Sequence, residues 1–165
     1  EGYDKDYVLD KLVNHIDLNM SFYDVMEHSK KVLRKLKEYG HEIYVITARM
    51  MHFKEKTIDW LNYHFGEGFF DGVLFYNHNA KERIPKYKVC KDERIDVLID
   101  DSPNNAKGAN RHGINVLVMS HPWNEHLKDT NILKRVNNWK DVHDYFAFHC
   151  LHLGLKDNSK GKKQK

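Results

Sequence analysis

The chain has 165 residues, 41% of them hydrophobic, which predicts a single globular domain with a packed core and leaves no length for a second full domain. No apolar run approaches the roughly 18–20 residues that a membrane-spanning helix needs, so we expect no membrane partner. The formal net charge of +3 comes from residues 156–165, which hold five lysines and one aspartate. The rest of the chain is nearly neutral, which argues against a nucleic-acid partner and predicts a basic, disordered tail at 154–165.

Two cysteines, Cys90 and Cys150, lie far apart and lack the spacing of a metal site or a disulfide framework. This usage is typical of a reducing compartment, so we expect a cytoplasmic protein. The 12 histidines are scattered and form no metal-binding pattern, which favours ordinary surface or core positions. The sequence does not fix the oligomeric state, and a homodimer is compatible with it.

Periodicity of the apolar residues predicts the elements in chain order. Residues at helical spacing predict helices over 5–16, 22–39, 53–64, 85–93, 103–112 and 139–153. Short β-branched and apolar runs predict buried strands over 42–48, 71–77, 95–100 and 115–120. Gly40 and Gly113 act as stop signals, and Ser102 followed by Pro103 has the composition of a helix start.

Strands that alternate with helices predict a three-layer, Rossmann-like α/β fold with a parallel sheet. We divide the chain into residues 1–20, the remnant of a small helical cap or an N-terminal helix, and a core over 21–153. In such folds the ligand site lies at the carboxyl ends of the strands. The candidate functional residues are therefore expected at strand ends.

Polar side chains stand where two of the predicted strands end. Thr47, Ala48 and Arg49 close the first strand, and Asp100 and Asp101 close the third. Two adjacent carboxylates repel each other and offer the hard oxygen ligands that Mg²⁺ takes together with water and a substrate phosphate. A threonine hydroxyl at a neighbouring strand end can donate a hydrogen bond to a phosphate oxygen.

A lysine ahead of the third strand would add positive charge to the same place. Lys86 is the first choice, and Lys88 is the nearby rival. Threonine, lysine and paired carboxylates together predict a site for phosphoryl transfer, in which positioning and charge stabilisation do most of the work.

This set resembles the haloacid dehalogenase-like (HAD) phosphohydrolase superfamily, whose second, third and fourth motifs match Thr47, Lys86 and the "VLIDDSPNN" segment with Asp100 and Asp101. More narrowly, "ITAR", "LIDDSPNN" and the "RVNNW" segment at 135–139 are similar to the 5'(3')-deoxyribonucleotidases and the small bacterial nucleotidase-like proteins. The resemblance covers roughly residues 20–145.

The resemblance implies a Mg²⁺-dependent phosphomonoesterase, a 5'-nucleotidase that acts on (deoxy)nucleotides through an aspartyl-phosphate. It implies that Asp100 and Asp101 bind the metal and that Thr47, Lys86 and Asp101 serve catalysis. It also places Thr47, Lys86 and their neighbours Ala48 and Arg49 on the substrate phosphate.

The superfamily's first motif, an apolar strand followed by Asp-x-Asp, has no counterpart in the sequence. Asp4 and Asp6 match the letters only, because no apolar strand precedes them and the segment runs into a helix. The missing strand is the central one of the fold, so the sheet should lack one strand, a gap of about 5 Å. We expect the nucleophile to lie upstream of Glu1 and the chain by itself to be inactive.

Other functions remain open from the sequence. One alternative is a non-catalytic phosphate- or nucleotide-binding module, a pseudo-phosphatase without a nucleophile. A receiver-like regulatory domain also uses acids, a threonine and a lysine, but in another order along the chain.

Each candidate residue also has a simpler interpretation. Asp101 or Ser102 could serve only to start a helix, Thr47 could be an ordinary strand residue, and Lys86 and Arg49 could be surface charges. Trp123 and Asn124 could line a base-binding pocket or, more commonly for a tryptophan after a strand, pack in the core.

Overall fold

The computed structural model describes residues 23–76 and 84–152, without the side chains of 149–152. The helices are α2 (Ser29–Glu38), α3 (Lys54–Phe65), α4 (Lys86–Asp92), α5 (Pro103–Arg111) and α6 (Trp139–His152), with 3₁₀ turns η2 (Met51–Phe53) and η3 (Pro122–Asn124). The strands are β1 (Tyr44–Thr47), β2 (Gly72–Phe75), β3 (Val97–Asp100), β4 (Asn115–Met119) and β5 (Leu133–Val136). The helix expected at 5–16, the segment 1–20 and the tail 154–165 lie outside the described residues.

The observed elements match the predicted ones in type and order, with two differences. The helix expected from residue 22 begins at Ser29, because His28 adopts a left-handed backbone with φ of 66° that no helix continues through. The strand β5 was not predicted at all. Leu133 and Val136 at its ends are buried, whereas Lys134 and Arg135 between them are more exposed, and such polar residues are typical of a short edge strand.

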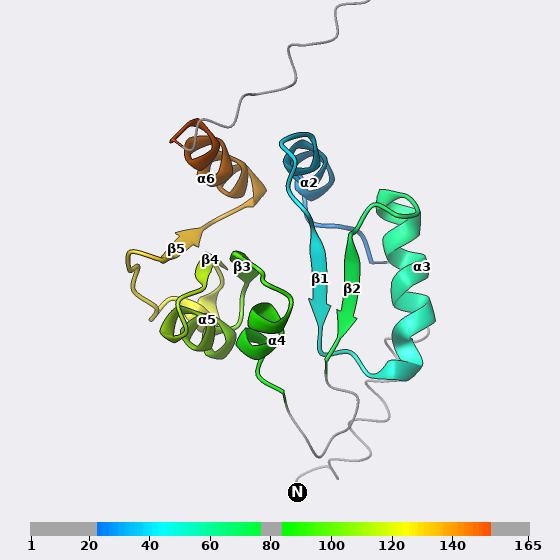
Figure 1. The fold of residues 1–165 in the computed structure, drawn as a ribbon, viewed down its shortest axis with the longest axis horizontal. Helices are drawn as coiled ribbons and strands as arrows, with labels where there is room; N and C mark the ends of the chain where they lie inside the picture. The colour runs from blue at the N-terminus through cyan, green and yellow to red at the C-terminus, as the bar shows by residue number, and fades with distance from the viewer. Residues whose placement is uncertain (1–22, 77–83, 153–165) are drawn as a thin grey trace, which may run out of the picture.

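Within the described part of the chain every strand pair is parallel, and the strands form two separate sheets (Figure 1). β1 pairs with β2, with Thr47 opposite Phe75. β3, β4 and β5 form the second sheet in that order, with Asp100 opposite Val118. The prediction that the sheet lacks its central strand agrees with this division, which leaves β1 and β3 as facing edges.

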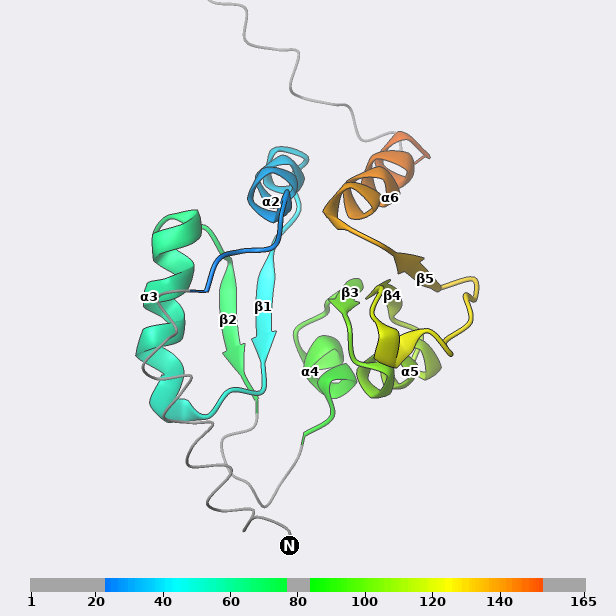
Figure 2. The same cartoon turned by 180° about the vertical axis from the view of Figure 1, so that it is seen from behind.

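Both faces of the β3–β4–β5 sheet are covered, which gives the three-layer arrangement. Along β4, Leu117 and Met119 pack with α2, α3 and α6 in one core cluster. Val116 and Val118 point to the other face and pack with α4 and α5. The two views in Figures 1 and 2 show α4 and α5 beside β3 and β4, with α2 and α6 adjacent to each other. The α/β fold predicted from alternating strands and helices is confirmed.

β1 is less buried than its sequence suggests. The apolar run at 42–48 is typical of a strand covered on both faces, yet none of the four residues Tyr44–Thr47 is buried. In contrast, four of the five residues of β4 are buried. The sequence of β1 therefore matches a more enclosed position than the described residues provide.

Candidate active site

The centre of the site is an ion pair between Lys86 and Asp100. Lys86 opens α4 after Pro85, and Asp100 ends β3, so the two approach from different elements. The Lys86 Nζ lies 2.5 Å from Oδ2 of Asp100, and the side chains are only 14% and 4% exposed. Lys86 rather than Lys88 therefore meets the acidic strand end, since Lys88 is exposed on the other side of the helix.

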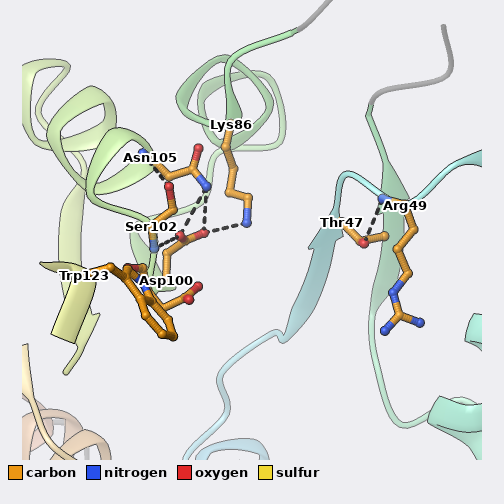
Figure 3. A network of polar contacts seen from close by, with 8 residues as sticks. Thr47, Arg49, Lys86, Asp100, Ser102, Asn105 and Trp123 are labelled. Atoms are coloured by element: carbon orange, nitrogen blue, oxygen red, sulfur yellow. Dashed lines mark hydrogen bonds and ion pairs between the residues drawn. The ribbon is translucent and has the colours of Figure 1, made fainter. Parts of the chain in front are cut away.

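The remaining acceptor positions of Asp100 are taken by the start of α5. The Ser102 N–H donates to Oδ1 at 2.8 Å, and the Asn105 side-chain amide donates to both carboxylate oxygens at 3.2 and 3.3 Å. Ser102 is the N-cap of α5, as expected, and its hydroxyl oxygen accepts from the Asn105 N–H at 3.5 Å. These contacts hold the Asp100 carboxylate in one orientation (Figure 3).

Asp101 is exposed, whereas Asp100 is buried. The loop after β4 is hydrogen-bonded to the backbone of Asp101. Its carbonyl oxygen accepts hydrogen bonds from Trp123 Nε1 at 3.2 Å and from Asn124 Nδ2 at 2.8 Å. Trp123 is 55% exposed, so its packing in the core, the commoner expectation, is wrong. Its ring stacks on that of His121, with centroids 4.3 Å apart and planes 6° from parallel.

Asn124 and Arg135 hold the loop after β4 in place through buried hydrogen bonds. Asn124 is fully buried, donates to the Met119 carbonyl at 2.8 Å, and accepts at Oδ1 from Arg135 at 2.8 Å. The same guanidinium donates to the carbonyls of Asn124 and Leu127 at 2.9 and 3.0 Å. Because every strong donor and acceptor of Asn124 is engaged, the loop that carries Trp123 is held rigidly beside Asp101.

Thr47 ends β1 and lies across from the Lys86–Asp100 pair (Figure 3). The Thr47 hydroxyl accepts a hydrogen bond from the Arg49 N–H at 3.2 Å, and Ala48 is exposed between them. The Arg49 guanidinium donates to Thr57 of α3 at 3.3 Å and thus extends away from Lys86. The structure places Thr47 and Asp100 at the carboxyl ends of β1 and β3 and Lys86 at the start of α4, and Thr47 is not hydrogen-bonded to the Lys86–Asp100 pair.

A family model described as "5' nucleotidase, deoxy (Pyrimidine), cytosolic type C protein" (NT5C) matches residues 7–150. The chain belongs to the NT5C family. A Bacillus subtilis protein named "Putative nucleotidase YqfW" is 32% identical over 132 residues, which are 77% of this NT5C chain and 62% of that protein. A Chlorobaculum tepidum protein named "Putative 5'(3')-deoxyribonucleotidase" is 24% identical over 135 residues, 75% of this chain and 56% of that protein.

Solved structures of the same fold include an L-2-haloacid dehalogenase, 17% identical, with a TM-score of 0.56 and coverage of 74% of this chain and 56% of that one. A haloacid dehalogenase-like hydrolase from Streptococcus pneumoniae is 16% identical, with a TM-score of 0.57 and coverage of 87% and 72%. The resemblance to HAD nucleotidases is confirmed, and the NT5C chain spans at most 62% of the two named relatives.

The donor set of the NT5C chain fits a hard divalent cation in part. Asp100 and Asp101 are carboxylates at one strand end, and Mg²⁺ commonly takes one or two carboxylates with water and substrate phosphate for the rest. Among residues 23–76 and 84–152, no cluster of three or more histidine, cysteine, aspartate or glutamate side chains could hold a metal ion. The exposed Asp101 is open to a cation, whereas Asp100 already accepts from Lys86 and Asn105.

Sequence reasoning missed three residues of the NT5C site. Asn105 lies within the "DDSPNN" segment, so its place one helical turn after the acids was a usable signal. Arg135 opens the "RVNNW" segment, which pointed to the family but not to a contact with Asn124. Tyr76 carried no signal, because it reaches the site only through the fold. Burial raises the pKa of the Tyr76 phenol, and the nearby Asp100 charge raises it further while Lys86 lowers it.

Cys90 of the NT5C chain is expected to be chemically inert. It lies in α4, is fully buried, and burial raises the pKa of its thiol to about 11 from an ordinary 9.0. In a Cys150→Ser variant, alkylation by iodoacetamide at about pH 8 should be slow in the folded chain and fast in urea, because only the thiolate reacts.

The same shift sets a pH dependence of stability. Between pH 9.0 and about 11 the unfolded chain loses the Cys90 proton while the folded chain keeps it. The unfolded state then binds fewer protons, so the free energy of unfolding should fall as pH rises through this range. A Cys90→Ala variant should show a smaller fall in urea titrations; equal falls in both proteins would contradict the assignment.

Proposed function

We propose that the chain is the core of a Mg²⁺-dependent phosphomonoesterase that hydrolyses nucleotides, deoxynucleotides among them, through an aspartyl-phosphate. The observation that carries this proposal is the enclosed Lys86–Asp100 pair at the carboxyl end of β3, with Thr47 at the end of β1 across from it. Family membership supports the reaction class, and the names of the relatives support a nucleotide substrate.

The residues take distinct parts in the proposed reaction. Lys86 offsets negative charge on the transferring phosphoryl group, and the Thr47 hydroxyl donates to one of its oxygens. The exposed Asp101, with Asp100, would hold Mg²⁺, which supplies charge neutralisation and orients the phosphate. Ala48 and Arg49 border the phosphate through the backbone that follows Thr47.

The nucleophile is proposed to come from outside the described residues. Residues 23–76 and 84–152 contain no Asp-x-Asp sequence, and the "DKD" at 4–6 lies outside them. The proposal therefore predicts no turnover by the chain alone. The same observation favours a second candidate, a pseudo-phosphatase module that binds phosphate or nucleotide without hydrolysing it.

One experiment separates these functions. The complete reading frame that contains the Glu1 codon and the 165-residue chain are each given Mg²⁺ and deoxyribonucleoside 5'-monophosphates, and phosphate release and nucleotide binding are measured. We expect Mg²⁺-dependent release by the complete frame, lowered at least about 100-fold in Lys86→Met, and binding without release by the chain.

Two results would contradict the proposal. Phosphate release by the chain itself would show that an external nucleophile is not needed. Binding without release by the complete frame would identify the binding module instead. A Lys88→Met variant is the matched control, because that lysine is exposed and does not contact Asp100, and it should keep its activity.

Trp123 is expected to contribute to recognition of the base. An exposed indole held rigidly beside Asp101 offers a flat face, and stacking of a base on an aromatic side chain contributes about 1–3 kcal/mol. Trp123→Ala should weaken binding of a deoxynucleoside monophosphate about tenfold or more and leave inorganic phosphate binding unchanged. Tyr63→Ala, which removes an 81% exposed ring of α3, serves as the control.

A further inference from the structure

We infer that His121 is a positioning residue for base recognition: its imidazole covers one face of the Trp123 indole, so that a nucleotide base stacks on the opposite face alone. That opposite face is called the base platform below. The two ring planes are 6° from parallel, and their centroids are 4.3 Å apart. Trp123 remains 55% exposed despite this stack, so the base platform is open to solvent. The inference rests on the proposed nucleotide function and adds to it the residue that presents Trp123.

The local sequence "HPWN" at 121–124 favours this stack. Pro122 fixes its own φ at about −65° and restricts the residue before it to extended backbone. His121 accordingly has φ of −149° and ψ of 156°, and the 3₁₀ turn η3 begins directly after it. Because a conformationally restricted proline separates the two rings, little backbone freedom remains to move one ring relative to the other.

Hydrogen bonds fix both members of the stack. The His121 N–H donates to Asn124 Oδ1 at 3.1 Å, and the His121 carbonyl accepts from the Asn124 N–H at 3.0 Å. Trp123 Nε1 donates to the Asp101 carbonyl at 3.2 Å, which holds one edge of the indole. This edge contact alone would still allow the indole to tilt, and the imidazole packed against one face opposes that motion.

The spacing of the two rings excludes a base from the space between them. A base in contact with both rings would need about 7 Å between them, twice the usual contact distance of about 3.5 Å. The centroids of His121 and Trp123 are only 4.3 Å apart. The site therefore receives one aromatic ring on the base platform, and not a base sandwiched between two side chains.

Stacking on a single indole face selects phosphate esters that carry an aromatic ring. Every nucleobase has a π-face, so a stacking surface tolerates all of them. A sugar phosphate has no such face and gains nothing from Trp123. Figure 3 shows the indole beside Asp100, on the side away from Thr47, so a stacked base would lie next to the proposed phosphate site. We therefore expect discrimination between nucleotides and sugar phosphates rather than among bases.

Binding measurements on the 165-residue chain with Mg²⁺ test the inference. The probes are the four common deoxyribonucleoside 5'-monophosphates, deoxyribose 5-phosphate and inorganic phosphate. The nucleotides should bind within about tenfold of one another and more tightly than deoxyribose 5-phosphate. His121→Ala should weaken nucleotide binding about threefold to tenfold, because the freed indole must be ordered on binding, and leave inorganic phosphate binding unchanged.

Two further variants separate the stack from other effects. His121→Phe keeps a flat ring under the indole and should bind nucleotides as the unmodified chain does. His126→Ala is the matched control, because it removes an exposed histidine of the same loop whose ring contacts Lys107, and it should also leave nucleotide binding unchanged.

A measurement without ligand separates the inference from the proposed function. In a Trp60→Phe/Trp139→Phe background, Trp123 is the only tryptophan of the chain. Its fluorescence anisotropy should decay faster in His121→Ala and be unchanged in His121→Phe. A decay that is the same with and without the imidazole would overturn the positioning role, whatever the chain binds.

The binding results distinguish the remaining cases. Nucleotide binding that is equal or tighter in His121→Ala would overturn the inference while the proposed function stands. Equal losses of nucleotide and phosphate binding would assign His121 to the fold and not to base recognition. Binding of inorganic phosphate but of no nucleotide by the unmodified chain would contradict the proposed nucleotide function, and the base platform with it.

Discussion

Asp100→Ala is expected to lower the free energy of unfolding by about 3–5 kcal/mol, the usual cost of breaking a buried ion pair by removing one partner. The substitution leaves the Lys86 ammonium, 14% exposed, without its 2.5 Å partner. It also deprives the Asn105 amide and the Ser102 N–H of their acceptor. Urea unfolding followed by circular dichroism measures the loss.

The matched control is the neighbouring carboxylate. Asp101→Ala removes an exposed acid, and we expect a change of no more than about 0.5 kcal/mol. The double variant Lys86→Met/Asp100→Leu replaces the pair by apolar groups and should recover most of the loss. A loss of equal size in Asp100→Ala and Asp101→Ala would show that the ion pair does not hold α4 to β3.

Asn124→Ala is expected to cost about 3 kcal/mol, because it breaks a buried network rather than one contact. Asn124 is fully buried and donates to the carbonyls of Asp101 and Met119. Its Oδ1 accepts from the His121 N–H and from Arg135. Removing the amide leaves all four groups short of a partner, and urea unfolding again gives the magnitude.

The position of Trp123 provides an independent measurement in the same variant. If Asn124 holds the loop against β3, its loss should free Trp123 from the Asp101 carbonyl. The fluorescence anisotropy of the Trp123 indole should then decay faster, as measured in a Trp60→Phe/Trp139→Phe background. Asn104→Ala removes an exposed amide at the start of α5 and serves as the control. Unchanged Trp123 mobility in Asn124→Ala would show that the indole is fixed by other contacts.

The sequence alone predicted most of the elements, since strong local patterns specify them. The apolar run before Asp100 and the Ser102–Pro103 helix start were correct at the level of residues. β5 was missed because an edge strand of four residues, half of them polar, has no distinctive pattern. The start of α2 was placed too early because His28 breaks the helix with a backbone conformation that apolar spacing does not reveal.

Prediction of the candidate site was likewise limited to what local sequence patterns reveal. Thr47, Lys86 and the two acids could be chosen from the sequence because each occupies a strand end or the helix before it, and parallel strands bring their carboxyl ends to one edge. Lys86 was the first choice from the sequence and Lys88 the rival; the structure places Lys86 against Asp100, and the two lysines lie on different sides of α4. Arg49 was grouped with the phosphate by its position after Thr47, but its guanidinium reaches Thr57.

By itself the sequence determined the three-layer α/β class, the order of the elements and the residue types at the strand ends, because these depend on periodicity and local backbone preference. Only the tertiary structure decided that Arg135 locks Asn124, that Trp123 stands exposed, and that β1 and β3 face an open groove. Those features arise from contacts between segments far apart in the chain, whose pairing depends on the shape of the whole fold and leaves no local mark.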